Sequence, residues 1–201
     1  MMHVIMLSWE YPPRVVGGIA RHVEDLAKAL VKQGVDVDVI TCGHDKAYEE
    51  EDDEGVKVFR VSFQNPSPPD FITWVMQMNL NLMERGIQRA AMGADLVHAH
   101  DWVVAYSAKA LKHAFNIPLV GTIHATEYGR NWGLHNDLQR YISNVEWWLG
   151  FESWRVICCS EHMRQELSWI FQLPGDKLRV IPNGVDPTRF AVSPNEDLEA
   201  F

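Results

Sequence analysis

The sequence predicts an α/β protein built on a doubly wound, mainly parallel sheet, and three observations carry this prediction. Short apolar runs alternate with helical stretches along the chain. Most of these runs lack the alternation of polar and apolar residues found in a sheet with one face in water, so we expect helices on both faces. The chain has 201 residues, 47% hydrophobic and 22% charged, which is enough to bury one sizeable core.

Seven strands are expected, each as a short run of mostly aliphatic residues. They cover residues 4–7, 35–41, 56–61, 96–99, 119–123, 156–159 and 178–181. Five helices are expected between them, at residues 19–30, 71–91, 103–115, 134–149 and 161–171. The first helix places its apolar residues on one face, and Gly34 is a typical residue to end it. This order is that of repeated βα units.

Two polar segments interrupt the series. Residues 49–54 are six consecutive acidic residues, and we expect a solvated loop there because like charges repel one another. Residues 64–70 are rich in proline and end in Asp70, a typical helix cap. Because βα units continue on both sides, neither break is a domain boundary. We expect one domain over residues 1–192, and a tail or the start of an interdomain linker over residues 193–201.

Charge and composition argue against several classes of protein. Eighteen Lys and Arg against 27 Asp and Glu give a net charge of -9, so we expect no overall attraction to nucleic acid or to an anionic membrane. No apolar run approaches the roughly 20 residues of a membrane span, and the start of the chain is strand-like rather than typical of a signal peptide. We therefore expect a cytoplasmic protein. The three cysteines have neither the number of a disulfide framework nor the usual spacing of a zinc site.

A glycine pair follows the first expected strand, at the sheet edge where open α/β proteins bind ligands. Gly17 and Gly18 allow a backbone to approach a ligand closely, and the helix that begins there has free N–H groups with partial positive charge. The pair is a candidate diphosphate site, although a simple turn closed by glycines gives the same pattern. The G-x-G-x-x-G dinucleotide spacing and the P-loop sequence are both absent.

Three histidines belong to the ends of the fourth and fifth expected strands. His98 and His100 are two residues apart, so both side chains point to one face of the sheet. His124 directly follows the next strand and lies at the same edge. Two interpretations stay open: a metal site, and a cleft in which an imidazole hydrogen-bonds a sugar or phosphate. Ser160 opens a helix and is expected to cap it, with contact to a ligand as its alternative role.

Five motifs, in order along the chain, resemble the amino-terminal half of retaining glycosyltransferases of family 4 and of the related starch and glycogen synthases. They are Glu10-Tyr11-Pro12-Pro13 with Gly17-Gly18, His98-Ala99-His100-Asp101-Trp102, Thr122-Ile123-His124, Cys159-Ser160, and Ile181-Pro182-Asn183-Gly184-Val185-Asp186. The resemblance covers residues 1–192. It implies the GT-B fold, in which two Rossmann-like domains face each other across a cleft. The first domain mainly holds the acceptor, and the second holds most of the nucleotide-sugar donor.

The resemblance also implies roles for single residues. Gly17 and Gly18 are expected against the donor diphosphate, and His124 beside the transferred sugar as the catalytic histidine. The other expected substrate contacts are Arg14, His100, Asp101, Thr126, Glu127, Ser160 and Asn183. Arg14 is included because Val15 stands where glycogen synthases of the bacterial type carry a lysine, and the adjacent guanidinium binds phosphate well.

The implied activity is that of a retaining hexosyltransferase. It would move a sugar, with glucose expected, from a nucleoside diphosphate to a hydroxyl acceptor such as an α-glucan. The scheme requires no metal and no cofactor. Its partners are the donor, the acceptor and a carboxyl-terminal domain that this chain lacks, so the chain alone is expected to be inactive.

Three alternatives stay open at this point. One is a metal-dependent hydrolase that uses His98, His100 and His124. Another is a noncatalytic glucan-binding module. A non-hydrolysing nucleotide-sugar epimerase, which shares the two-domain architecture, is the third.

Overall fold

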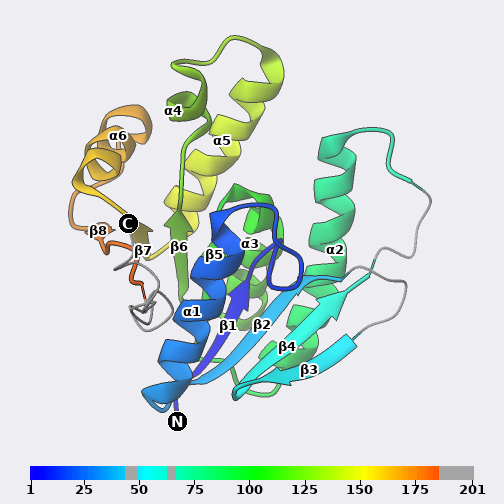
Figure 1. The fold of residues 1–201 in the computed structure, drawn as a ribbon. Helices are drawn as coiled ribbons and strands as arrows, with labels where there is room; N and C mark the ends of the chain where they lie inside the picture. Colours follow the sequence, from blue (N-terminus) through cyan, green and yellow to red (C-terminus); the bar gives the residue numbers. More distant parts are fainter. Residues whose placement is uncertain (44–48, 63–66, 186–201) are drawn as a thin grey trace, which may run out of the picture.

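The computed structural model describes residues 1–43, 49–62 and 67–185, so the expected boundary at residue 192 lies outside the described residues. The described residues form a sheet in the order β3-β4-β2-β1-β5-β6-β7-β8 (Figure 1). All neighbouring strands are parallel except β3 and β4. The strands are β1 His3–Leu7, β2 Asp36–Cys42, β3 Glu49–Asp53, β4 Val56–Val61, β5 Leu96–His100, β6 Leu119–Ile123, β7 Arg155–Cys158 and β8 Leu178–Val180. The predicted doubly wound, mainly parallel sheet is confirmed.

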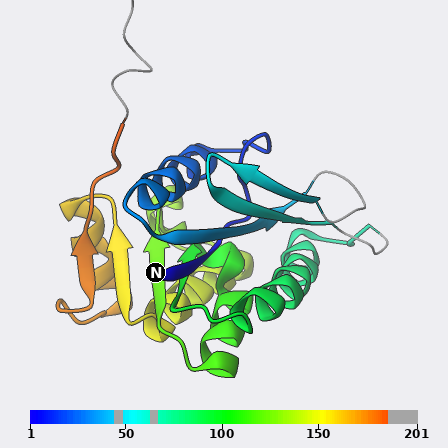
Figure 2. The same ribbon diagram turned by 90° about the horizontal axis from the view of Figure 1, so that it is seen from below.

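Helices cover both faces of this sheet (Figure 2). They are α1 Gly18–Lys32, α2 Phe71–Ala90, the short 3-10 helix η1 Trp102–Val104, α3 Ala105–Phe115, α4 Glu127–Asn131, α5 Asp137–Glu152 and α6 Glu161–Phe171. The helix α1 packs on one face, and α2, α3 and α5 pack on the other. Within the described part of the chain, no helix combines the length and the apolar character needed to cross a bilayer.

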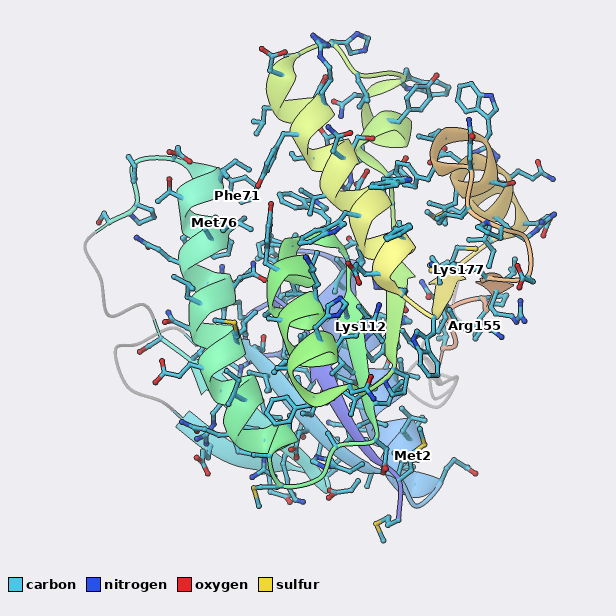
Figure 3. All side chains as sticks on the ribbon, turned by 180° about the vertical axis from the view of Figure 1, so that it is seen from behind. Met2, Phe71, Met76, Lys112, Arg155 and Lys177 are labelled. Atoms are coloured by element: carbon cyan, nitrogen blue, oxygen red, sulfur yellow. The ribbon has the colours of Figure 1, made fainter. Side chains whose placement is uncertain are left out.

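Alternate residues of one strand serve two different cores. In β1, Val4 and Met6 pack with the α1 cluster, whereas Ile5 and Leu7 pack with the α2, α3 and α5 cluster. This two-sided burial explains why the strand is a continuous apolar run in the sequence. On the face with three helices, Lys112 of α3 forms an ion pair with Glu152 at the end of α5 (Figure 3). Its Nζ lies 2.9 Å from the Glu152 carboxylate.

Several helix ends follow the expected signals. Gly34 has a φ of +83°, a left-handed conformation that favours glycine, directly after α1. The Asp70 carboxylate accepts a hydrogen bond from the Thr73 N–H at 2.8 Å, and the Ser160 hydroxyl accepts one from the Met163 N–H at 3.2 Å. Both side chains therefore cap their helices as predicted.

The expectation of a solvated loop at residues 49–54 is wrong. Glu49–Asp53 form the edge strand β3, which pairs antiparallel with β4. Basic side chains from neighbouring elements offset the acidic run: Arg60 pairs with Glu51, and Lys28 Nζ lies 2.9 Å from Asp53 Oδ1. Repulsion within a run of like charges does not decide its structure when cations are supplied from elsewhere in the fold.

The strand order reverses beside β1, which has β2 on one side and β5 on the other. In open α/β sheets the crevice at such a reversal, beyond the carboxyl ends of the strands, is where ligands bind. The segment between β1 and α1, residue Asp101 after β5 and His124 after β6 all lie at this edge. The topology therefore places most of the expected site residues in one region.

Candidate functional site

A hollow of about 420 Å³ lies at this carboxyl edge of the sheet. It is lined by Trp9, Glu10, Val16, Gly17, Gly18, Ile19, Asp101, His124, Arg130, Cys159 and Asn183. The structure thus brings together five residues that the sequence placed at the site: Gly17, Gly18, Asp101, His124 and Asn183. A larger hollow of about 510 Å³ lies beside α5 and α6, where these helices lead into β7 and β8, and Lys177 is its one charged lining residue. The polar hollow at the strand reversal is the better candidate.

The turn before α1 is held by a carboxylate. Gly17 is extended and precedes the helix, which begins at Gly18. One oxygen of the buried Glu10 carboxylate accepts hydrogen bonds from the N–H groups of Val16, at 2.6 Å, and Gly17, at 2.8 Å. The Gly17 amide is therefore not free, which differs from the expectation of two open glycine amides.

Gly18 is the open position of the turn. As the first residue of α1, it has an N–H group without an intrahelical acceptor. A Cβ atom added at Gly18 would meet nothing within 4 Å, so the space beside this residue is empty. The helix start can therefore meet an anion at Gly18, with the partial positive charge of the helix behind it.

Imidazoles gather at the base of the hollow. His98 and His100 share one face of β5, and their ring centroids are 4.2 Å apart. His98 Nε2 lies 2.7 Å from the hydroxyl oxygen of Thr122, so this buried ring has a partner inside the fold. His100 Nδ1 lies 3.3 Å from Nε2 of His124, which lines the hollow.

His22 of α1 completes this group of rings. Its centroid lies 4.7 Å from that of His124 and 5.4 Å from that of His100. No strong signal in the sequence pointed to His22. It is four residues after Gly18, and residues at this spacing share one face of a helix, so the spacing could have pointed to it.

Burial keeps these imidazoles neutral at pH 7. Desolvation lowers the pKa of His22 to about 4 and that of His124 to about 4. It also lowers the pKa of His98 to about 3, and that of the fully buried His100 well below its usual range. Each ring can therefore donate or accept a hydrogen bond without carrying a charge.

Asp101 orients His124 through the backbone. Its Oδ1 accepts a hydrogen bond from the His124 N–H at 2.8 Å, and its own N–H donates to the Thr122 carbonyl at 2.9 Å. Burial raises the pKa of Asp101 to about 6, against the stabilising effects of the His124 N–H and of Arg130. An Nη atom of Arg130 lies 3.6 Å from Asp101 Oδ2, so a cation faces this carboxylate at the wall of the hollow.

A second buried carboxylate stands behind this wall. Both oxygens of Glu146 accept from the Glu127 N–H, at 2.8 and 3.0 Å, at the start of α4. Burial raises the pKa of Glu146 to about 8. Arg130 also lies 3.7 Å from Glu127 and 4.0 Å from Glu146, so three acidic side chains surround this one guanidinium. No sequence signal pointed to Arg130 or Glu146, because their contact depends on the packing of α4 against α5.

Other expected contacts do not line the hollow. Thr126 is buried and caps α4 by accepting from the Gly129 N–H at 2.9 Å. Ser160 is used as the cap of α6. The guanidinium of Arg14 lies over the rings of Trp9 and Trp74, 5.9 Å from each centroid. The structure thus points this cation at an aromatic pair, outside the lining of the hollow.

Asn183 closes the hollow from the carboxyl-terminal side of the described chain. Its amide oxygen lies 3.2 Å from Cys159 Sγ, and its side chain also hydrogen-bonds with His22. The segment after β8 is therefore tied both to β7 and to α1. Through Asn183, the turn that is expected to lead toward a second domain contacts the group of histidines.

These features define a class of protein: a Rossmann-like α/β domain with a polar ligand site at the reversal of its strand order. The sequence profile of Glycosyltransferase Family 4 matches residues 16–189. The chain belongs to this family.

Individual relatives agree with the family. The chain is 40% identical over 196 residues to an uncharacterized glycosyltransferase of Methanocaldococcus jannaschii, covering 96% of the chain and 48% of the relative. It is 37% identical over 205 residues to a glycogen synthase of Mycobacterium tuberculosis, covering 94% and 50%. A sucrose-phosphate synthase from Thermosynechococcus elongatus has the same fold, with a TM-score of 0.75 at 20% identity over 94% of the chain and 49% of that structure.

The chain spans about half the length of the curated relatives that it matches. Its fold is that of the amino-terminal domain of a GT-B glycosyltransferase, as the resemblance implied.

Proposed function

We propose that this chain is the acceptor-side domain of a retaining glycosyltransferase. The enzyme transfers a sugar, with glucose preferred, from a nucleoside diphosphate to a hydroxyl acceptor of the α-glucan type, and it acts in the cytoplasm. The single observation that carries the proposal is the hollow in which Gly18 at the start of α1, Asp101 and His124 share one lining. The 37% identity to a glycogen synthase supports the choice of glucose and glucan.

The helix start accounts for the leaving group. Negative charge grows on the departing diphosphate as the bond to the sugar breaks, and preorganised N–H donors stabilise such charge by about 3 kcal/mol each. Because Glu10 occupies the Gly17 amide, Gly18 and the first turn of α1 are the donors that remain for the phosphate. A carboxyl-terminal domain would hold the remainder of the donor across the cleft.

His124 accounts for the orientation of the sugar. A neutral imidazole can hydrogen-bond a sugar hydroxyl in either direction, and the low pKa of His124, about 4, keeps it neutral under working conditions. The hydrogen bond from the His124 N–H to Asp101 holds the backbone of His124 in place, and this sets the position from which the imidazole extends. His124 therefore positions the sugar beside the reacting carbon and does not act as a nucleophile.

The hydrolase alternative receives no comparable support. It requires His98, His100 and His124 on one ion, but His98 Nε2 is engaged with Thr122. The family is also one of glycosyltransferases.

The proposal is tested with the two-domain enzyme that contains this chain. The enzyme is incubated with α-linked nucleotide sugars and a maltooligosaccharide, and the product is examined by NMR. We expect UDP-glucose or ADP-glucose to give an elongated α-linked product, whereas the 201-residue chain alone gives none. A β-linked product, release of free sugar without transfer, or full activity from the chain alone would contradict the proposal.

A further inference from the structure

An aromatic surface lies on α4, on the side of this helix away from the hollow. Trp132, the C-cap of α4, is 92% exposed, more than any other aromatic side chain of the described residues. Tyr128 lies one turn before it, so the two residues share a face of α4. Trp169 of α6 is 67% exposed and meets Tyr128 edge to face, with ring centroids 5.4 Å apart. We call these three side chains the rim aromatics.

The rim aromatics are separate from the site at the strand reversal. They do not line the hollow, whereas Arg130 of the same helix does. An α-helix turns by about 100° per residue, so residues two apart point to nearly opposite sides. Tyr128 and Trp132 therefore lie across α4 from the hollow. Figure 1 shows α4 beyond the end of β6, with α6 beside it.

The backbone around Trp132 is held in one conformation. Trp132 has a φ of 55°, in the left-handed region that bulky residues rarely adopt. The Gly133 N–H donates to the Tyr128 carbonyl at 3.0 Å, and Nε2 of His135 lies 2.9 Å from the Asn131 carbonyl oxygen. The indole is thus presented to solvent from a fixed backbone, so little conformational entropy is lost when a ligand stacks on it.

Contacts between α4 and α6 keep Trp169 beside Tyr128. The Thr126 hydroxyl donates to the carboxylate of Glu166 in α6, and a Cβ atom added at Gly129 would meet this carboxylate at 2.9 Å. Glu166 and Trp169 are three residues apart and are neighbours on the surface of α6. The close approach at Gly129 brings Trp169 against α4, so the two helices present the rim aromatics as one surface.

Charge narrows the class of ligand that suits this surface. Exposed aromatic rings stack on flat faces, which both sugar rings and nucleic acid bases offer. The arginines of α4, α5 and α6 are all paired with carboxylates, and two of these pairs are Arg140 with Asp137 and Arg164 with Glu161. Because the chain also has a net charge of -9, a phosphate backbone would be repelled. An uncharged sugar polymer fits the surface better than a nucleic acid.

We propose that the rim aromatics form a second α-glucan site, which holds the distal part of a long acceptor whose end lies in the hollow. The inference rests on the proposed function, which supplies the α-glucan. A helix with its side chains is about 10–12 Å across, so an acceptor needs several sugar units to span α4. The site therefore favours long acceptors over maltose, which is too short to occupy both places.

Binding is measured on the 201-residue chain by calorimetry with maltoheptaose. Trp132→Ala and Trp169→Ala should each weaken binding by about 10-fold or more, because a stacked ring is lost. Trp154→Ala is the matched control and should leave binding unchanged, because Trp154 is 59% exposed but lies beyond the opposite end of α5 from α4. A dT oligonucleotide should give no heat of binding, and circular dichroism confirms that each variant is folded.

Kinetics of the two-domain enzyme give a second readout. Trp132→Ala should raise the KM for maltoheptaose by about 10-fold and leave kcat, the KM for maltose and the KM for the nucleotide sugar unchanged. If Trp132 instead contacts the second domain or only supports the fold, the constants for the donor and for maltose change as well.

Maltoheptaose binding that Trp132→Ala weakens and Trp154→Ala preserves supports the site. Absence of binding, equal binding by Trp132→Ala and the natural chain, equal weakening by Trp154→Ala, binding of the oligonucleotide in place of maltoheptaose, or a changed donor KM overturns it. If the natural two-domain enzyme does not elongate maltoheptaose, the proposed function fails, and the calorimetry on the chain alone still decides whether the glucan site exists.

Discussion

Asp101 has the most constrained backbone near the hollow. Its φ of 64° and ψ of 170° lie in a region that is populated almost only by glycine, where another residue costs about 1–3 kcal/mol. Such a conformation persists when the surrounding structure holds it in place. Here the Asp101 N–H donates to Thr122 of β6, and the Asp101 carboxylate accepts from the N–H of His124, the residue after β6. Strain of this kind is concentrated at functional sites, which agrees with the place of Asp101 in the lining.

The hydrogen bond from the His124 N–H to Asp101 can be tested with two uncharged substitutions. Asp101→Asn keeps an acceptor oxygen, whereas Asp101→Ala leaves the buried N–H without a partner. We expect the free energy of unfolding of the alanine variant to be lower than that of the asparagine variant by about 1–3 kcal/mol. Urea denaturation followed by tryptophan fluorescence measures both. Equal stability of the two variants would show that the bond is not formed.

Glu146 makes stability depend on pH in a direction unusual for a carboxylate. Its pKa rises from the ordinary 4.5 to about 8 on folding because the side chain is buried. Between these pH values the unfolded chain loses a proton that the folded chain retains, so this group makes folding less favourable as the pH rises. Below pH 4.5 and above pH 8 its contribution is constant.

Glu146→Gln removes this titration and keeps the shape of the side chain. We expect the stability of the variant relative to the natural chain to increase from pH 4.5 to pH 8, by at most about 1.4 kcal/mol per pH unit. Urea unfolding at a series of pH values measures the difference, and any constant effect of the lost oxygen cancels. Parallel profiles for the two proteins would rule out the raised pKa.

At the scale of elements, β3 and the loop after β1 depend on one buried cation. The Arg60 side chain is 3% exposed, although it lies on β4 near the edge of the sheet. It bonds Glu51 of β3 and donates to the carbonyl oxygens of Tyr11 and Pro12. Arg60 therefore holds both the acidic edge strand β3 and the segment that leads to Gly17 in place.

Arg60→Ala should lower the free energy of unfolding by about 2–3 kcal/mol, because it leaves buried carbonyl oxygens without a charged donor. Lys57→Ala on the same strand is the matched control. Lys57 is 46% exposed in its ion pair with Asp36, so its loss should change stability by less than about 1 kcal/mol. Chemical denaturation of both variants checks the difference, and similar losses would refute the assigned role of Arg60.

The sequence predicted the elements well where local pattern decides them. Helix α6 was expected with the bounds 161–171 that it has, and the caps Asp70 and Ser160 carry local signals. β3 was missed because its cations come from other elements, and α4 was missed because it has five residues and a single cap.

For the site, strand ends pointed to Gly18, Asp101 and His124, but His22 lies inside a helix and joins them only through tertiary packing.

At the scale of the whole molecule, the topology explains why residues far apart in sequence meet. The strand order reverses at β1, so loops from both halves of the sheet converge where α1 begins (Figure 1). The lining of the hollow is built in this way, with a helix start, a buried aspartate and a neutral imidazole on it. In the proposed enzyme, a second domain facing this hollow would complete the enclosure that a transfer reaction needs to exclude water.

The central claim is that a sugar diphosphate meets the start of α1 at Gly18. Gly18→Asp adds a carboxylate in open space, and an acidic residue in the first turn suits the helix, so the fold should remain intact. Gly175→Asp adds the same group at an exposed position with equally open space and is the control.

The direct measurement is kcat/KM for the nucleotide sugar in the complete two-domain enzyme carrying each variant. We predict a loss of about 100-fold or more for Gly18→Asp and no change for Gly175→Asp. Equal kcat/KM values for Gly18→Asp and the natural enzyme would contradict the account.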